Sequence, residues 1–302
     1  MCCTTDREYF LGLRDTVRHA VVRGELEQAL VICDEAHRWA ERHGSPTDVD
    51  FVSCSQLAIR LHQGHGDSVI RELQKILMRS SDATIRHLAA YSISNYYELR
   101  EDFEKSRFYT QLALDHAAKA GSDFYLARTH TNFGNLLIRE SHFEDALLSL
   151  EKALELFTEE QLYERLSVLT GMGYCHLASG RYTEGFEKLF TVRRTYLRLR
   201  MGWGMALGRL RLSFCFGYLE IGKYRLAILH GRAGMEIGER CGDHSLVKKA
   251  LYLLGEAEKL DGDEMAAYTY YARLQEEFYP DNPYLPDLLL DHDTNTFINL
   301  WA

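Results

Sequence analysis

Small residues recur along the chain at a nearly constant interval, each inside a short pattern of large and small positions. In the clearest copy, Phe143 is followed by Ala146, Leu150 and Ala153, which share one face of a helix. The residues that anchor the copies stand at positions 29, 69, 106, 146, 185, 227 and 267, at intervals of 37 to 42 residues. Seven anchors at this spacing predict seven copies of one structural unit.

A second group of small residues lies about a dozen positions before most anchors, as in Phe133-Gly134, Met172-Gly173 and Leu254-Gly255. Gly costs about 1 kcal/mol in a helix interior, so its recurrence at one register implies a packing role. Small residues let two antiparallel helices approach closely. Turn signals such as Ser179-Gly180 and Asp261-Gly262 stand between the two groups. These signals therefore predict that each unit consists of a helix A, a tight turn and a helix B.

The periodicity predicts an all-α protein of about seven antiparallel helix pairs. Gly at helix ends and Asp or Ser at helix starts divide the chain into units of about 10–46, 47–82, 83–122, 123–161, 162–203, 204–243 and 244–278. We expect these units to form a single solenoid domain over residues 1–278. Pro280, Pro283 and Pro286 follow, and they predict that the last helix stops after Phe278.

Residues 279–302 form a C-terminal segment with apolar residues among acids. The last pair of a helix-pair stack exposes an apolar face, so we expect this segment to act as a cap. A tail that docks in a groove remains an alternative. The groove would belong to its own chain or to a second copy, giving autoinhibition or a homodimer.

The succession of Leu or Phe, Gly and, beyond the turn, two small residues resembles the tetratricopeptide repeat (TPR). The resemblance covers about residues 10–278 and implies a right-handed α-solenoid. The family's usual period is about 34 residues. The longer period here is similar to the variant found in kinesin light chains and in sensor domains of bacterial signalling proteins. The leading Trp of the family pattern is absent.

The resemblance also implies a ligand surface, because fixed positions of helix A line the concave groove in that family. These positions give the peptide- or partner-binding candidates Tyr91, Asn95, Arg128, Thr131, Asn132, Asn135, Tyr174, Arg209, Phe216, Lys249 and Tyr252. Asn95 and Asn135 occupy the same position in adjacent units and resemble the family's peptide-clamping asparagines, since an amide both donates to and accepts from a peptide backbone. The cations could bind carboxylate or phosphate, and the aromatic residues could act as flat anchors. Polar surface filler and ordinary packing are the alternatives.

Charge and composition narrow the classes of partner. The chain of 302 residues has a formal net charge of -9, which argues against a chain-wide nucleic-acid surface. Residues 190–211 reverse this charge locally, because they hold six arginines and no acid. They could attract an acidic partner or a phosphate, or could simply be a solvated face.

Targeting and cysteine chemistry give no special signal. The first residues contain no apolar segment typical of a secretory signal, and no apolar run approaches the roughly 20 residues of a membrane span. The seven cysteines are scattered, without a CxxC pair, which favours reduced thiols over disulfides or zinc. The adjacent Cys2 and Cys3 could be a lipidation or redox site, or an unstructured start. We expect a cytoplasmic protein that does not act on membranes.

Recognisable catalytic motifs are missing. His62, His65 and Asp67 could hold a metal, but an ordinary polar turn explains them as well. Neither HExxH nor GxSxG occurs, and Gly171-Met172-Gly173 lacks the rest of a phosphate loop. Cys175 and His176 are sequence neighbours on a helix, so their side chains diverge. We therefore expect no cofactor, no metal and no enzymatic activity.

The leading hypothesis is a non-enzymatic adaptor or sensory module that binds another protein or an extended peptide along the groove of helices A. An acidic partner is one form of this hypothesis. A self-associating assembly or chaperone-like scaffold is the alternative. An enzyme with an unrecognised active site is the third reading.

Overall fold

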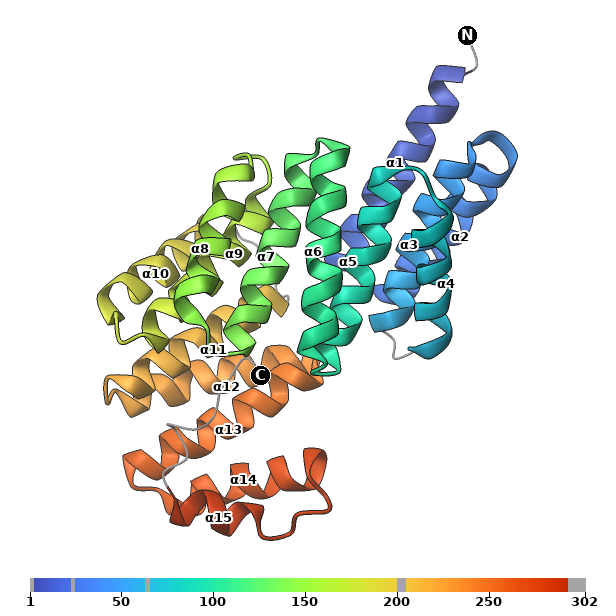
Figure 1. Cartoon of the computed structure of the whole chain (residues 1–302). Helices are drawn as coiled ribbons and strands as arrows, with labels where there is room; N and C mark the ends of the chain where they lie inside the picture. Colours follow the sequence, from blue (N-terminus) through green and yellow to red (C-terminus); the bar gives the residue numbers. More distant parts are fainter. Residues whose placement is uncertain (1–2, 23–24, 63–65, 200–204, 293–302) are drawn as a thin grey trace. The chain divides into compact units, whose positions relative to one another are not determined.

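The computed structural model describes residues 3–22, 25–62, 66–199 and 205–292, and within these ranges it contains helices and no strand. The helices are labelled in Figure 1. Their bounds are α1 (Cys3–Val22), α2 (Leu26–His43), α3 (Pro46–His62), α4 (Asp67–Arg79), α5 (Ala83–Leu99), α6 (Phe103–Ala120), α7 (Asp123–Arg139), α8 (Phe143–Leu156), α9 (Leu162–Ala178), α10 (Tyr182–Arg198), α11 (Met205–Glu220), α12 (Tyr224–Cys241), α13 (His244–Asp261), α14 (Glu264–Phe278) and α15 (Leu285–Asp291).

The first fourteen helices follow one another in the order that seven helix pairs require, and α14 ends at Phe278 as expected. The anchor residues are buried in every pair, with Ala29, Ala146, Ala227 and Ala267 fully enclosed. Helix α1 begins at Cys3, several residues before the first predicted unit, and α15 adds a short helix within the C-terminal segment.

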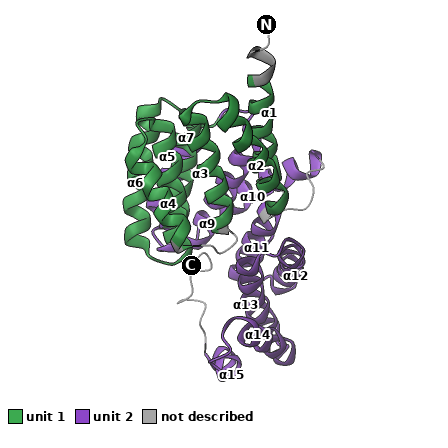
Figure 2. Cartoon of the chain, turned by 90° about the vertical axis from the view of Figure 1, so that its right-hand side faces the viewer, with its two compact units in different colours: residues 1–136, 155–157 green, residues 137–154, 158–302 purple. Residues whose placement is uncertain are grey.

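The described chain forms two compact units, which Figure 2 shows in green and purple. Unit 1 comprises residues 1–136 and 155–157, and unit 2 comprises residues 137–154 and 158–302. The single solenoid over residues 1–278 with a tail at 279–302 therefore stays a prediction.

Unit 1 contains two apolar cores. One gathers around Phe10, Ala29 and Ala36 of the first pair, and the other around Leu73, Ile85 and Ile93. One core of unit 2 includes Leu166, Leu189 and Phe214.

Recurrent glycines have the packing role that the sequence predicts. A Cβ on Gly173 in α9 would lie 2.6 Å from Leu189 Cδ2 and 3.2 Å from the main-chain oxygen of Gly185 in α10. A Cβ on Gly255 in α13 would lie 2.2 Å from the ring of Tyr271 in α14. Real Cβ atoms do not approach so closely, so these helix pairs can form their observed contacts only with Gly at these positions.

The tight turns inside five pairs pass through the left-handed backbone region. Gly180, Gly222 and Gly262 have φ values of 74°, 69° and 95°, and the non-glycine residues Glu101 and Ser141 have values of 59° and 62° at the corresponding places. This conformation is the usual helix C-terminal arrangement that satisfies the last carbonyl groups. Glu101 and Ser141 adopt it at a steric cost that Gly avoids.

Helix α15 lies against the last pair of unit 2. The Nζ atom of Lys259 in α13 donates to the main-chain oxygens of Leu289 at 2.8 Å and His292 at 3.1 Å. Leu289 is buried. The final ten residues, with the apolar positions near Trp301, lie outside the described residues, as do Cys2, the side chains of Cys3, His62, His65 and Asp67, and residues 200–204.

Candidate functional site

The helix-A face of unit 1 combines an aromatic ring with a guanidinium group. Helix α5 carries Tyr91 and α7 carries Arg128, whose Cζ lies 4.9 Å from the centre of the Tyr91 ring. The same Cζ lies 5.7 Å from the ring of Phe124, one helical turn earlier on α7. Both members of the main pair are half-buried. A cation held over an aromatic face is pre-oriented, which reduces the entropy that it loses on meeting a partner.

The buried side chain of His87 packs against the Tyr91 ring of this pair. It is only 1% exposed, its Nδ1 lies 3.2 Å from the main-chain oxygen of Ala113, and its ring packs against Tyr125 at 4.7 Å and Tyr91 at 5.8 Å. Burial, with a smaller contribution from Arg128, lowers the pKa of His87 to about 4. The imidazole is therefore neutral at physiological pH and acts as a packing element.

Asn95 lies one turn after Tyr91 on α5, and its amide oxygen lacks a hydrogen-bond donor among the described residues. The side chain is half-buried, and its Oδ1 is enclosed without a hydrogen-bond partner among the described residues. A buried carbonyl oxygen without a donor costs roughly 1–3 kcal/mol, so native proteins rarely leave one unpaired. Asn135, at the equivalent position of α7, is also half-buried.

The structure assigns Asn132 a different place from the one the sequence suggests. It is 7% exposed, and its Nδ2 donates to Ser94 Oγ at 3.2 Å. Ser94 Oγ in turn lies 2.6 Å from Thr110 Oγ1, so this buried polar layer joins α5, α6 and α7. Thr131, next to it, donates its hydroxyl to the main-chain oxygen of Ala127 at 2.9 Å. We therefore assign Asn132 to packing and leave it out of the binding surface.

The helix-A face of unit 2 is cationic. Arg209 on α11 is exposed and Lys249 on α13 is half-buried. Burial, followed by the charges of Arg209 and Arg139, lowers the pKa of Lys249 to about 7. Three basic side chains thus converge on this face, which makes it suited to a carboxylate or another anion.

The aromatic candidates of unit 2 divide between surface and core. Phe216 is half-buried and its ring lies 5.1 Å from that of Tyr174. Tyr174 and Tyr252 are 3% and 6% exposed, so both rings belong to the packed interior. Of the predicted anchors in this unit, only Phe216 presents a substantial accessible surface.

Glu256 occupies in α13 the position that Asn95 has in α5, but it is fully buried. Its Oε1 accepts hydrogen bonds from the hydroxyl of Tyr271 and from Lys259 Nζ, the latter at 3.1 Å. The same ammonium group holds α15. This end of the helix-A row is consequently occupied by the protein's own side chains.

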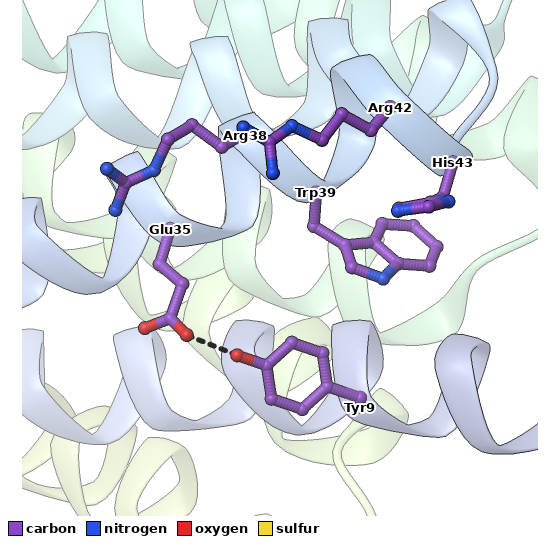
Figure 3. A pocket seen from close by; sticks show the side chains of 6 residues that line it. All are labelled: Tyr9, Glu35, Arg38, Trp39, Arg42 and His43. Atoms are coloured by element: carbon purple, nitrogen blue, oxygen red, sulfur yellow. Dashed lines mark hydrogen bonds between the residues drawn. The ribbon is translucent and has the colours of Figure 1, made fainter.

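Sequence reasoning missed a depression between α1 and α2 in unit 1, shown in Figure 3. Its volume is about 280 Å³ and its lining residues are Tyr9, Glu35, Arg38, Trp39, Arg42 and His43. The ring of Trp39 stacks on Phe10 at 4.6 Å, and the hydroxyl of Tyr9 donates to Glu35. The signal available in the sequence was the four-residue spacing of Glu35, Trp39 and His43 along one helix face.

In the part of the chain that the structure describes, no group of three or more His, Cys, Asp or Glu side chains could hold a metal ion. Among the same residues, no helix is both long enough and apolar enough to cross a bilayer.

Comparisons with known proteins define the fold class. No protein-family model matches the sequence, and no curated protein matches it. Solved structures do match. A Rap protein complexed with Competence and Sporulation Factor has a TM-score of 0.70 at 11% identity, over 95% of this chain and 78% of that one.

Two further structures agree. The apo form of RapI has a TM-score of 0.61 at 12% identity, over 97% of this chain and 83% of that one. A tetratricopeptide repeat protein from Parabacteroides merdae has a TM-score of 0.56 at 14% identity, over 94% and 98% of the two chains. Identities this low show the fold alone. The chain has a TPR-like fold of the all-α solenoid class, built from helix pairs, as the repeat resemblance implied.

Proposed function

We propose that the protein is a non-enzymatic binding module that holds an extended segment of a partner protein on helix-A faces. The observation that carries this proposal is the enclosed Oδ1 of Asn95, which has no donor among the described residues. A backbone N–H of an extended segment would supply that donor once the half-buried side chain turns its amide outward. Because every residue except proline has this group, the contact needs no particular partner sequence.

The surroundings of Asn95 favour a peptide-like ligand over a small molecule. Tyr91 and Arg128 offer a flat apolar surface and a charge next to the amide. Aromatic and Arg side chains of this kind dominate the binding energy of many protein interfaces. Asn135 repeats the amide on α7, so a segment running across α5 and α7 could be held at two backbone positions.

The cationic face of unit 2 supports a partner with acidic residues. Arg209 and Lys249 stand there in a protein whose net charge is -9, so an acidic segment would be attracted locally and repelled elsewhere. One similar solved structure is, by its name, a complex with Competence and Sporulation Factor, and another is an apo form. These names describe those proteins, and they support the proposal that this chain also binds a ligand.

The test begins with a partner-independent ligand. Peptides that bind the purified full chain are selected from a displayed random library, and the dissociation constant of a synthetic winner is measured by calorimetry. The double variant Asn95→Ala, Asn135→Ala should weaken binding about 10- to 100-fold, because each lost hydrogen bond contributes about 1 kcal/mol or slightly more. Acidic residues should be enriched among the winners.

A matched control is Gln28→Ala, which removes an exposed amide from helix B of the first pair in the same unit. Its affinity should equal that of the unmodified protein. Equal affinity of the double asparagine variant, with an unchanged thermal midpoint, would refute the clamp. A library that yields no saturable binder would refute peptide binding altogether.

A further inference from the structure

The arginines of α10 and α11 differ from the other arginines of unit 2. Arg181, Arg232, Arg240 and Arg273 each form an ion pair with a Glu. In the described residues, no carboxylate pairs with any arginine of a second group: Arg193, Arg194, Arg198, Arg209 and Arg211. The intervening sequence, Arg-Met-Gly-Trp-Gly at 200–204, adds a basic residue and no acid. Among the described residues, these five arginines therefore have no paired carboxylate, in a protein with 44 acidic residues.

The register of α10 against α11 places two of these arginines opposite each other. The ring of Phe190 lies 5.2 Å from that of Phe214, and the ring of Phe186 lies 4.9 Å from that of Tyr218. A step of four residues back along α10 thus matches a step of four forward along α11, so the helices run antiparallel. Three residues beyond Phe190 stands Arg193, and three residues before Phe214 stands Arg211. Both residues therefore stand about one helical turn past the aromatic contact, at the same level of the two helices.

Helix α12 packs against α11 next to these two arginines. The ring of His230 packs against Phe214 at 4.8 Å and Tyr218 at 5.4 Å. One turn later, a Cβ on Gly234 would lie 3.5 Å from Arg211 Cβ and 2.6 Å from Leu212 Cδ2. Gly234 therefore lets the backbone of α11 come close, and the Cβ of Arg211 lies against α12, one turn from His230.

Electrostatics agree with this placement. Burial is the larger cause and the charge of Arg193 the smaller cause of a lowered pKa of Arg211. Burial, followed by the charges of Arg211 and Arg193, lowers the pKa of His230 to about 4. His230 is 5% exposed and its Nδ1 has no hydrogen-bond partner in the described residues. The half-buried guanidinium of Arg211 and the exposed guanidinium of Arg193 therefore repel each other unless an anion lies between them.

We propose that Arg193 and Arg211, beside His230 at the junction of α10, α11 and α12, form a binding site for a phosphate-type oxyanion. Two arginine forks match the geometry of a tetrahedral oxyanion with two negative charges, and they bind it through several charge-assisted hydrogen bonds. The site uses none of the helix-A residues of the proposed peptide surface. It can therefore be tested independently of that function.

The shared chemistry has two sources: a free oxyanion, or the phosphomonoester of a modified side chain or metabolite. Calorimetry on the full chain measures the binding of inorganic phosphate and, in a second series, of phosphoserine, both in chloride buffer of constant ionic strength. Arg193→Gln and Arg211→Gln should each weaken phosphate binding at least tenfold. Tighter binding of phosphoserine indicates a monoester and tighter binding of phosphate indicates a free oxyanion; both outcomes support the site.

Thermal stability gives a second test, in which the same substitution that weakens phosphate binding should stabilise the phosphate-free protein. In chloride buffer, Arg193→Gln should raise the thermal midpoint because it removes a repulsion. Phosphate should raise the midpoint of the unmodified protein and leave that of Arg193→Gln unchanged. The control Arg225→Gln changes an exposed arginine of α12 and should keep the full response to phosphate. The proposal is overturned if phosphate binds no more tightly than chloride, or if both glutamine variants bind it as well as the unmodified chain does.

Discussion

Replacement by alanine should lower the stability of the protein at Asn132 and leave it almost unchanged at Asn95. Asn132→Ala removes a buried amide whose Nδ2 donates to Ser94 Oγ at 3.2 Å, inside the polar layer completed by Thr110. The lost hydrogen bond contributes about 0.5–1.5 kcal/mol, and the lost packing of a buried side chain adds about 1 kcal/mol. We expect Asn132→Ala to lower the free energy of unfolding by about 1.5–2.5 kcal/mol.

Asn95→Ala removes an amide oxygen that has no donor in the free protein. Deleting an enclosed unpaired acceptor removes a desolvation penalty, so we expect a change within about 0.5 kcal/mol, or a small gain in stability. Urea unfolding followed by circular dichroism measures both variants. Since unit 1 and unit 2 could unfold separately, the transition that moves in Asn132→Ala is the one compared. Equal losses in the two variants would refute the division into packing and binding residues.

Three further predictions concern the packing and the turns. Below pH 6.5 the protein should lose stability as the pH falls towards 4, by up to about 3 kcal/mol for each of His87 and His230. Their folded pKa values of about 4 lie below the unfolded value, so the unfolded state binds more protons in this window; urea midpoints that stay constant from pH 7 to 5 would contradict this. Gly255→Ala should cost at least about 2 kcal/mol in a thermal or urea melt, because its Cβ would meet the Tyr271 ring at 2.2 Å, and a neutral effect would show that the α13–α14 contact is looser than described. Glu101→Gly should stabilise the protein by up to about 1 kcal/mol, because it relieves a left-handed φ of 59°; a loss of stability would show that the Glu side chain matters more than the backbone.

The helix pairs were predictable because their signal repeats. Anchors such as Ala146 and Ala227 stand at a fixed interval, and each is fully buried in the structure. Gly173 carries its own explanation, since a small residue at a recurring helix position implies close packing. The proline cluster likewise identified the end of α14 at Phe278.

The binding surface was less predictable, because position in a repeat gives the face of a helix but not the depth of burial. Asn132 and Asn95 both fall on predicted groove positions, yet only Asn132 meets a serine of the neighbouring helix. Tyr252 is buried although Tyr91, at a comparable position, is half-exposed. Such differences depend on which side chains the next helix presents, and one sequence period does not contain that information.

Long-range partners explain the remaining differences. The Tyr9–Trp39 depression joins two helices whose facing residues are about thirty positions apart, and neither helix predicts it alone. The burial of Glu256 depends on a tyrosine fifteen residues later and on Lys259, which also holds α15. A pattern read within single helices cannot identify these combinations.

The most direct test of the central claim is a crystal structure of the chain bound to a library-selected peptide. The distance to measure joins Asn95 Oδ1 to the nearest peptide main-chain nitrogen. We expect 2.7–3.2 Å, about the normal range for an N–H···O hydrogen bond, with the peptide extended beside Tyr91 and Arg128. A peptide bound elsewhere, with Asn95 Oδ1 still enclosed and unpaired, would contradict the account.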